Sequence, residues 1–360
     1  MQGAWPWLLL LLPVAAVAMA LSGRRPRARG AKPPRDAASR NGAAAETTGA
    51  RVRVRFSDTA TELLHIAFYR TAFGDELLET SVLSSERELL RAIHGSLREV
   101  VGDRQYFPRK PLIIPQLLRA IKSDEASKKQ LVDIIVQDPV LTADVLRLAN
   151  NAHYRRSAEA VDTLGRALSL LGMDGLRSLV STSLLQPVFR VPRGYFGRFS
   201  DTVWQQTSLS ALAAQTYARR SGSCDSFTAH LTALLLSVGT IVLFRLTVDK
   251  HGRISTEPPQ AELFVRVLDE GADALSRAIA KDWDLAPQIL TALDEHVRKL
   301  DVDRMSALGR TVYYGRLFGT AALLHRHRKL QQTEIRGLML AKGLRGDDFD
   351  GIWPLLSSAA

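Results

Sequence analysis

The sequence predicts an all-α protein, and three observations support that prediction. Leu, Ala, Arg and Glu dominate the composition, and long alternating runs of β-branched residues are scarce. Apolar residues recur at helical spacing along the chain after residue 56. Ser, Asp, Asn, Pro and Gly stand where those apolar runs would begin and end.

Length and composition fit a globular protein with a sizeable core. The chain has 360 residues, of which 46% are hydrophobic and 24% are charged, so it can hold two or three domains. Cys224 is the only cysteine, so an intramolecular disulfide is excluded.

The positive charge is concentrated near the amino terminus. Residues 24–55 hold ten Lys or Arg and two acidic residues, which supplies +8 of the net +11 and leaves about +3 for the rest. The folded part is therefore close to neutral, and we expect no nucleic-acid partner. The basic stretch suits anionic lipid headgroups or a membrane-topology signal better than a DNA groove.

Residues 3–23 predict a membrane anchor. They contain no charged side chain, and about 20 apolar residues in a helix can cross a bilayer core of roughly 30 Å. Arg24, Arg25 and Arg27 follow directly, so the positive-inside rule predicts a single pass through the inner membrane and a cytoplasmic body. The alternative is a cleaved secretory signal with a periplasmic protein. A signal peptide carries its positive charge before the apolar stretch, and here the charge comes after.

The anchor (1–23) is followed by a basic flexible linker (24–55) and two accessory helices (56–105). Ser57 and Asp58 can cap the first helix, and Gly74 ends it. Ser85 to Glu88 form a capping box for the second helix. The apolar faces of both helices need a partner, either in the following sequence or in another chain.

A helix boundary at Asp138–Pro139 is the clearest local signal in the next part of the chain. Pro139 suits the first position of a helix and Asp138 suits its cap. Asn150 and Asn151 can cap the other end, because Asn tolerates left-handed backbone angles. A further helix is predicted to stop at Gly172, where another begins.

Four sequence blocks give the chain a resemblance to a known family. They are PLIIP at 111–115, DP at 138–139, LANNAHY at 148–154 and ALSLLG at 167–172. In order and spacing they are similar to the HDOD family, the HD-related output domains of bacterial signalling proteins. The resemblance covers about 106–300 and implies a five-helix bundle followed by an HD-like helical lobe. Residues 301–360 would then add C-terminal helices.

The signature positions have a structural and a functional reading. These positions are Asp138, Pro139, Asn150, Asn151, His153 and Tyr154. The structural reading, which we favour, is that they cap helices and pack the bundle. The alternative is that the polar helix end contacts a ligand or a partner.

The second half of the resembling region predicts longer helices. Their expected ranges are 200–220, 226–246, 262–268, 274–283 and 287–300, followed by 305–327 and 334–344. Aromatic residues at 349–354 could dock the carboxyl tail.

Positions where HD-type phosphohydrolases carry metal ligands are altered. The resemblance places the first His at Gln206 and the His-Asp dyad at Ser237 and Val238. Another expected His position falls at Ala272, and His296 remains. An amide is a poor metal ligand and valine cannot bind metal, so we expect no metal, no cofactor and no enzymatic activity.

The resemblance therefore implies a non-catalytic output or scaffold domain that binds a cytoplasmic signalling partner while tethered to the inner membrane. The alternative is a divergent metal-dependent phosphohydrolase acting on a nucleotide or cyclic dinucleotide.

Overall fold

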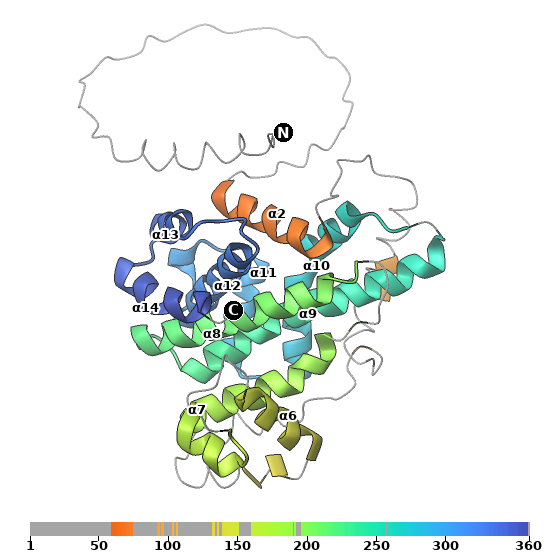
Figure 1. Cartoon of the computed structure of the whole chain (residues 1–360). Coiled ribbons are helices and arrows are strands. Elements are labelled where there is room, and N and C mark those ends of the chain that lie inside the picture. The colour runs from red at the N-terminus through yellow and green to blue at the C-terminus, as the bar shows by residue number, and fades with distance from the viewer. Residues whose placement is uncertain are drawn as a thin grey trace, which may run out of the picture. The chain divides into compact units, whose positions relative to one another are not determined.

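The computed structural model describes residues 59–74, isolated positions between 92 and 106, residues 132–150 with gaps, and residues 160–358 apart from 190, 192–195 and 257. Every regular element in these ranges is a helix, which confirms the all-α prediction (Figure 1). Residues 64–360 group into one compact unit, and residues 1–63 into another. The expected anchor and basic linker lie outside the described residues.

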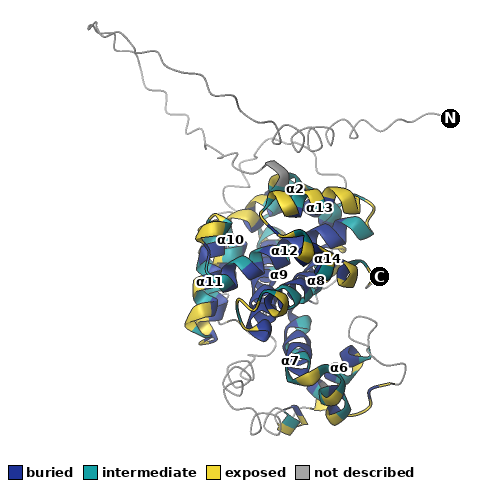
Figure 2. Cartoon of the chain, turned by 90° about the vertical axis from the view of Figure 1, so that its left-hand side faces the viewer, coloured by how far each residue is buried: buried dark blue, intermediate teal, exposed yellow. Residues whose placement is uncertain are grey.

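The larger lobe is built around α9 (Ser226–Ile254), which packs against α7, α8, α10, α11 and α12. α8 (Phe199–Ser221) lies along α12 (Ala307–Arg326). α10 (Ala261–Asp282) leads into α11 (Pro287–Val297) on the other side of α9. The apolar side chains of these helices form one continuous core, drawn dark blue in Figure 2.

Among the described helices, α9 is long and apolar enough to cross a membrane by length and composition. Its most apolar window is nevertheless 78% buried against the other helices of the lobe. Leu235, Val238 and Ile241, for example, are completely inaccessible to solvent. We therefore describe α9 as the central core helix of a globular lobe.

A smaller lobe consists, in its described part, of α6 (Pro139–Ala149) and α7 (Leu164–Leu185), with an apolar core of its own. Thr163 caps α7 by accepting a hydrogen bond from the amide of Arg166. Gly172 breaks α7 with φ of 70° and ψ of −179°, angles that favour glycine. The predicted boundary between two helices at Gly172 is thus confirmed. The second half of α7 reaches α9, directly and through the 3₁₀ turn Gln186–Phe189.

From Leu64 onward, α2 (Thr59–Phe73) packs against the larger lobe. The ring of Phe73 lies 4.6 Å from that of Phe199 and 4.9 Å from that of Phe196. Gly74, with φ of 106°, ends the helix at the predicted position. The first accessory helix therefore finds its partner in the sequence that follows it.

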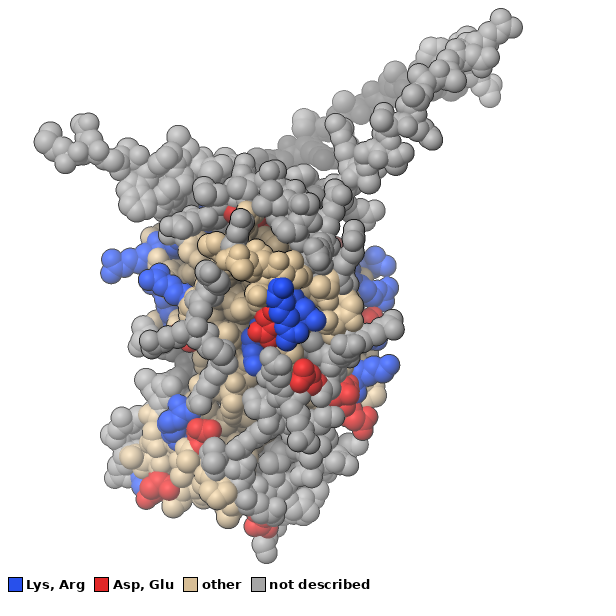
Figure 3. All heavy atoms as spheres, turned by 90° about the vertical axis from the view of Figure 1, so that its right-hand side faces the viewer, with Lys and Arg blue, Asp and Glu red and all other residues tan. Residues whose placement is uncertain are grey.

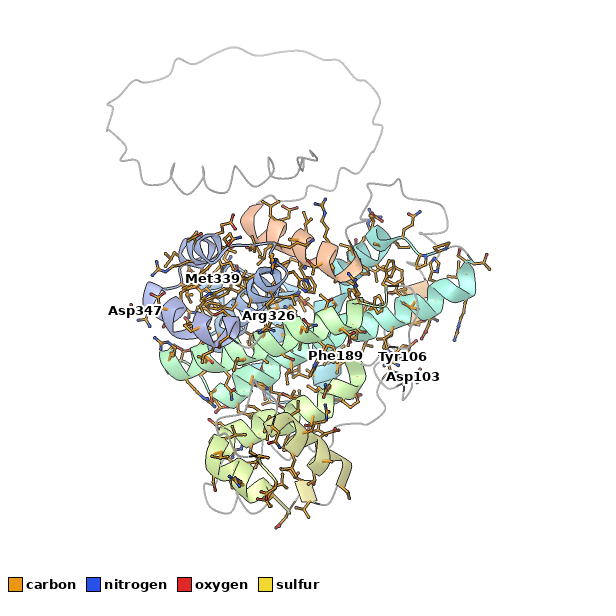
Figure 4. The ribbon with its side chains drawn as sticks, viewed as in Figure 1. Asp103, Tyr106, Phe189, Arg326, Met339 and Asp347 are labelled. Atoms are coloured by element: carbon orange, nitrogen blue, oxygen red, sulfur yellow. The ribbon has the colours of Figure 1, made fainter. Side chains whose placement is uncertain are left out.

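A further contact anchors the chain just before the region of family resemblance. The hydroxyl of Tyr106 donates to Oδ2 of Asp249 at 2.7 Å, and the guanidinium of Arg245 lies over its ring. Figure 4 places Tyr106 and Asp103 beside one end of α9. The helix predicted between Ser85 and Gly102 lies mostly outside the described residues.

Three predicted helix boundaries in this lobe are wrong. α10 is one continuous helix, although a break between 268 and 274 was expected. Gly271 lies within this continuous helix. Because it has no side chain, α9 can pack closely against α10 at this point: a Cβ at Gly271 would lie 2.9 Å from Cδ2 of Leu243. α9 extends to Ile254, beyond 246, and α11 ends at Val297, before 300.

The carboxyl tail docks through aromatic residues, as predicted. Phe349 and Trp353 are buried and stacked with ring centroids 5.6 Å apart, and Phe349 stacks on Phe318 of α12. They belong to α14 (Gly346–Ser357), which follows α13 (Gln332–Ala341). The sequence predicted C-terminal helices over 301–360 but gave no bounds for this last one.

Candidate HD-like centre

Gln206 of α8 contributes to packing between two helices. Its side chain is buried, and Nε2 donates to Oγ1 of Thr320 on α12 at 3.1 Å. The two helices approach closely here because Gly319, next to Thr320, has no side chain. A Cβ at Gly319 would come within 2.8 Å of the carbonyl oxygen of Gln206. The amide of Gln206 therefore links α8 to α12.

Ser237 and Val238 lie in the middle of α9, where α10 crosses it. Val238 is completely buried, and Ser237 is nearly so. Beside them, Oγ of Ser276 accepts from the amide of Gly239 at 3.1 Å and donates to the carbonyl of Leu236 at 2.9 Å. This hydroxyl therefore bonds directly to the α9 backbone.

The sequence reasoning missed Ser276. Its one available signal was a small polar residue on the otherwise apolar face of α10.

His296 of α11 is buried beside the start of α12. Its Nε2 donates to the carbonyl of Gly309 at 3.2 Å. Burial lowers its pKa to about 4, although the nearby Asp273 carboxylate acts in the opposite direction. His296 is therefore a neutral imidazole at physiological pH. Its neighbour Glu295 accepts from the amide and the hydroxyl of Ser306, which caps α12.

Asp273 and Arg316 form an ion pair between α10 and α12. Nη1 of Arg316 lies 3.1 Å and 3.3 Å from the two carboxylate oxygens of Asp273. Burial alone would raise the pKa of Asp273, but Arg316 and His296 lower it below its usual value. The Asp273 carboxylate in turn raises the pKa of Arg316. The sequence did not predict this pair.

α2 supplies the neighbouring groups. Nδ1 of His65 lies 3.6 Å from Oδ1 of Asp269, one turn before Asp273 on α10. Burial lowers the pKa of His65, despite the opposing effect of Asp269. Burial raises the pKa of Tyr69, and its hydrogen bond to Asp269 adds to the shift. Asp269, Asp273, His65, Tyr69, His296 and Arg316 thus make one polar centre, called the Asp273 centre below.

The HDOD domain family matches residues 107–298, more than half of the chain. The chain belongs to the HDOD family. Its HDOD domain includes α6 to α11, and α2, α12, α13 and α14 lie outside the match. The Asp273 centre therefore combines HDOD residues with residues that the family match does not cover.

Two known proteins are similar to this chain. The first is an uncharacterized protein of Treponema pallidum (strain Nichols), which is 24% identical over 56% of this chain. The chain spans 39% of that protein's length. The second is a crystal structure from Shewanella amazonensis SB2B, named as a candidate metal-dependent phosphohydrolase. It superposes with a TM-score of 0.53 and 19% identity, covering 77% of this chain and 99% of that one.

A third HDOD comparison is a crystal structure from Geobacter sulfurreducens, named as an HDOD domain protein with unknown function. It is 18% identical with a TM-score of 0.45, over 83% of this chain and 98% of the other. At 19% identity the Shewanella structure shows the fold alone.

Two of the six HDOD signature positions, Pro139 and Asn150, are described, and both belong to the smaller lobe. Pro139 begins α6, as predicted. The side chain of Asn150 caps the carboxyl end of α6. Its Nδ2 donates to the carbonyls of Leu146 and Val161, and its Oδ1 accepts from the amide of Val161. These bonds hold the return of the chain against the helix end. Asp138, Asn151, His153 and Tyr154 lie outside the described residues.

The groups present do not fit the divalent metal of an HD-type site. Such a metal needs imidazole and carboxylate ligands with free electron pairs directed at one point. Here Gln206 donates to Thr320, Val238 is a hydrocarbon, and Asp273 is bonded to Arg316. The described residues hold no group of three or more His, Cys, Asp or Glu side chains with metal-binding geometry. We therefore derive no metal-dependent step for this chain.

Proposed function

We propose that this HDOD protein is a non-catalytic signal-transduction scaffold, tethered to the inner membrane, that binds a cytoplasmic signalling partner. One observation supports the non-catalytic part above all others. Side chains at the expected metal positions hold helices together: Gln206, in place of a histidine, joins α8 to α12, and the remaining His296 joins α11 to α12. Groups that serve packing in this way are not available to bind and activate water.

A protein partner fits the charge distribution better than a nucleic acid does. On the face drawn in Figure 3, the Lys, Arg, Asp and Glu side chains of the described residues lie scattered among other residues. Nucleic-acid interfaces instead gather basic side chains into a continuous patch. The strongly basic part of the chain is the linker at 24–55, which suits a membrane surface.

Replacement of His296 by Gln tests the non-catalytic function. Glutamine can keep an N–H donor for the Gly309 carbonyl but is a poor metal ligand. In cells whose own copy has been deleted, a scaffold carrying His296→Gln should restore the phenotype as fully as the natural chain. Purified full chain should hydrolyse neither a cyclic dinucleotide nor a phosphodiester with Mn²⁺ present. Stoichiometric bound metal with turnover that His296→Gln abolishes would instead support the phosphohydrolase alternative.

The membrane tether is tested separately. Deletion of residues 3–23 should move the chain from the membrane fraction to the soluble fraction. A compartment reporter inserted after residue 60 should give a cytoplasmic signal. A periplasmic signal would support the cleaved-leader alternative.

A further inference from the structure

The altered positions are connected to a partly buried ion pair through one face of α12. Thr320 accepts from Gln206, and Arg316 lies one turn earlier on the same face of the helix. Arg316 contacts Asp273, and Asp273 lies within electrostatic range of His296. A continuous set of neighbours thus runs from the first altered position, Gln206, to the remaining histidine.

The Asp273 centre holds acidic side chains whose charge needs compensation. Neither histidine provides that compensation near neutral pH, because burial lowers the pKa of both His65 and His296. The side chains of Arg316 and Asp273 are only 37% and 22% exposed, so water screens the carboxylate incompletely. Arg316 is the cation that contacts Asp273 among the residues the structure describes.

We propose that Arg316 supplies, from within the chain, the positive charge that a divalent ion supplies in an HD-type site. α12 lies beyond the HDOD match at 107–298, so this charge comes from the C-terminal helices. The guanidinium is fixed to α12, contacts α10, and stands beside α2 and α11. It thus links α12 to α10 in a centre whose remaining side chains do not form a metal site.

The proposal makes Arg316 a positioning residue. This proposal rests on the non-catalytic function proposed above, but its test measures the melting temperature. The proposed function is tested by phenotype and by turnover. Failure of one is therefore distinguishable from failure of the other.

The test compares the melting temperatures of full-length chains in detergent. Arg316→Met should lower the melting temperature by about 5 °C or more, because it leaves Asp273 without its cation. Arg316→Lys keeps the charge and should recover most of this loss. The matched control is Arg336→Met, which breaks the exposed pair with Asp350 (3.0 Å) and should change the melting temperature by about 2 °C at most.

A second variant distinguishes lost charge from lost packing and stays informative if Arg316→Met does not fold. Asp273→Asn combined with Arg316→Met removes both charges and should be more stable than Arg316→Met alone. The proposal is overturned if the Asp273 substitution brings no recovery, or if Arg316→Met behaves like Arg336→Met. It is also overturned if the purified natural chain holds one equivalent of Mn²⁺ that Asp273→Asn releases.

Discussion

The two lobes of the HDOD domain use polar side chains in different ways. In the smaller lobe the polar contacts are mostly local: Asn150 bonds Leu146 and Val161, and Thr142 bonds the carbonyl of Ile135. The larger lobe has local contacts too, but several of its polar contacts join residues far apart in sequence, as Gln206 does with Thr320 and Arg316 with Asp273. The first kind ends helices, and the second kind sets how helices pack. Substitutions should therefore have local effects in the smaller lobe and lobe-wide effects in the larger one.

The largest expected effect comes from filling the close contact between α8 and α12. Gly319→Leu would force a side chain against the α8 backbone at Gln206 and Ser210. We expect a loss of about 3 kcal/mol or more in the free energy of unfolding, measured by urea denaturation. The matched control is Gly165→Leu in α7, where a Cβ would meet nothing within 4 Å. That substitution should be neutral or slightly stabilising, because it removes a glycine from a helix. Equal losses at both positions would contradict the distinction between the lobes.

Acid should weaken the larger lobe through His296. The folded-state pKa is about 4, below the ordinary value of 6.5, so the unfolded chain binds this proton first as the pH falls. The contribution of neutral His296 to the free energy of unfolding is fully present above pH 6.5. It is lost progressively between about pH 6.5 and 4, and its upper bound is about 3 kcal/mol.

Denaturant unfolding of the natural chain and of His296→Gln at several pH values measures this contribution. The variant should lose less stability over this interval, since its amide does not titrate. Asp273 contributes in a separate interval. Its pKa lies below 3.8, so its contribution is present above 3.8 and is lost only at more acidic pH. If the natural chain and His296→Gln lost stability equally over this interval, the pKa of His296 would not be lowered by folding and the prediction would be wrong.

Local signals in the sequence were enough to predict the ends of several helices. Gly74, Pro139, Thr163 and Gly172 each act through their own backbone or a neighbour, so one sequence contains the necessary information. The break expected between 268 and 274 is absent. Gly271, in that stretch, admits Leu243 from α9, and this contact depends on tertiary packing.

The family resemblance predicts altered metal positions at Gln206, Ser237 and Val238, but the surroundings of these residues could not be predicted from the sequence. The structure shows Gln206, Val238 and His296 in helix packing, where sequence alone indicated only that ligands were missing. Arg316 and Ser276 were overlooked because each acts across a helix interface. Arg316 is 43 residues from Asp273, and Ser276 is 37 residues from Gly239. Neither spacing has a periodicity that a single sequence reveals.

The smallest effect is expected at the polar end of α6. Asn150→Ala removes three hydrogen bonds, two of which hold Val161 against the helix end, and leaves two carbonyls and one amide to find water instead. Because Asn150 is only partly buried, water can replace some of these bonds, and we expect a loss of about 1–2 kcal/mol. Hydrogen exchange should show faster opening of amides around Val161 and little change in α8 and α12. The control is Arg147→Ala on the exposed face of the same helix, where the pair with Asp144 contributes about 0.5 kcal/mol or less. Faster exchange throughout α8 and α12 would mean that the helix end stabilises both lobes together, and the separation between local and long-range polar contacts would then fail.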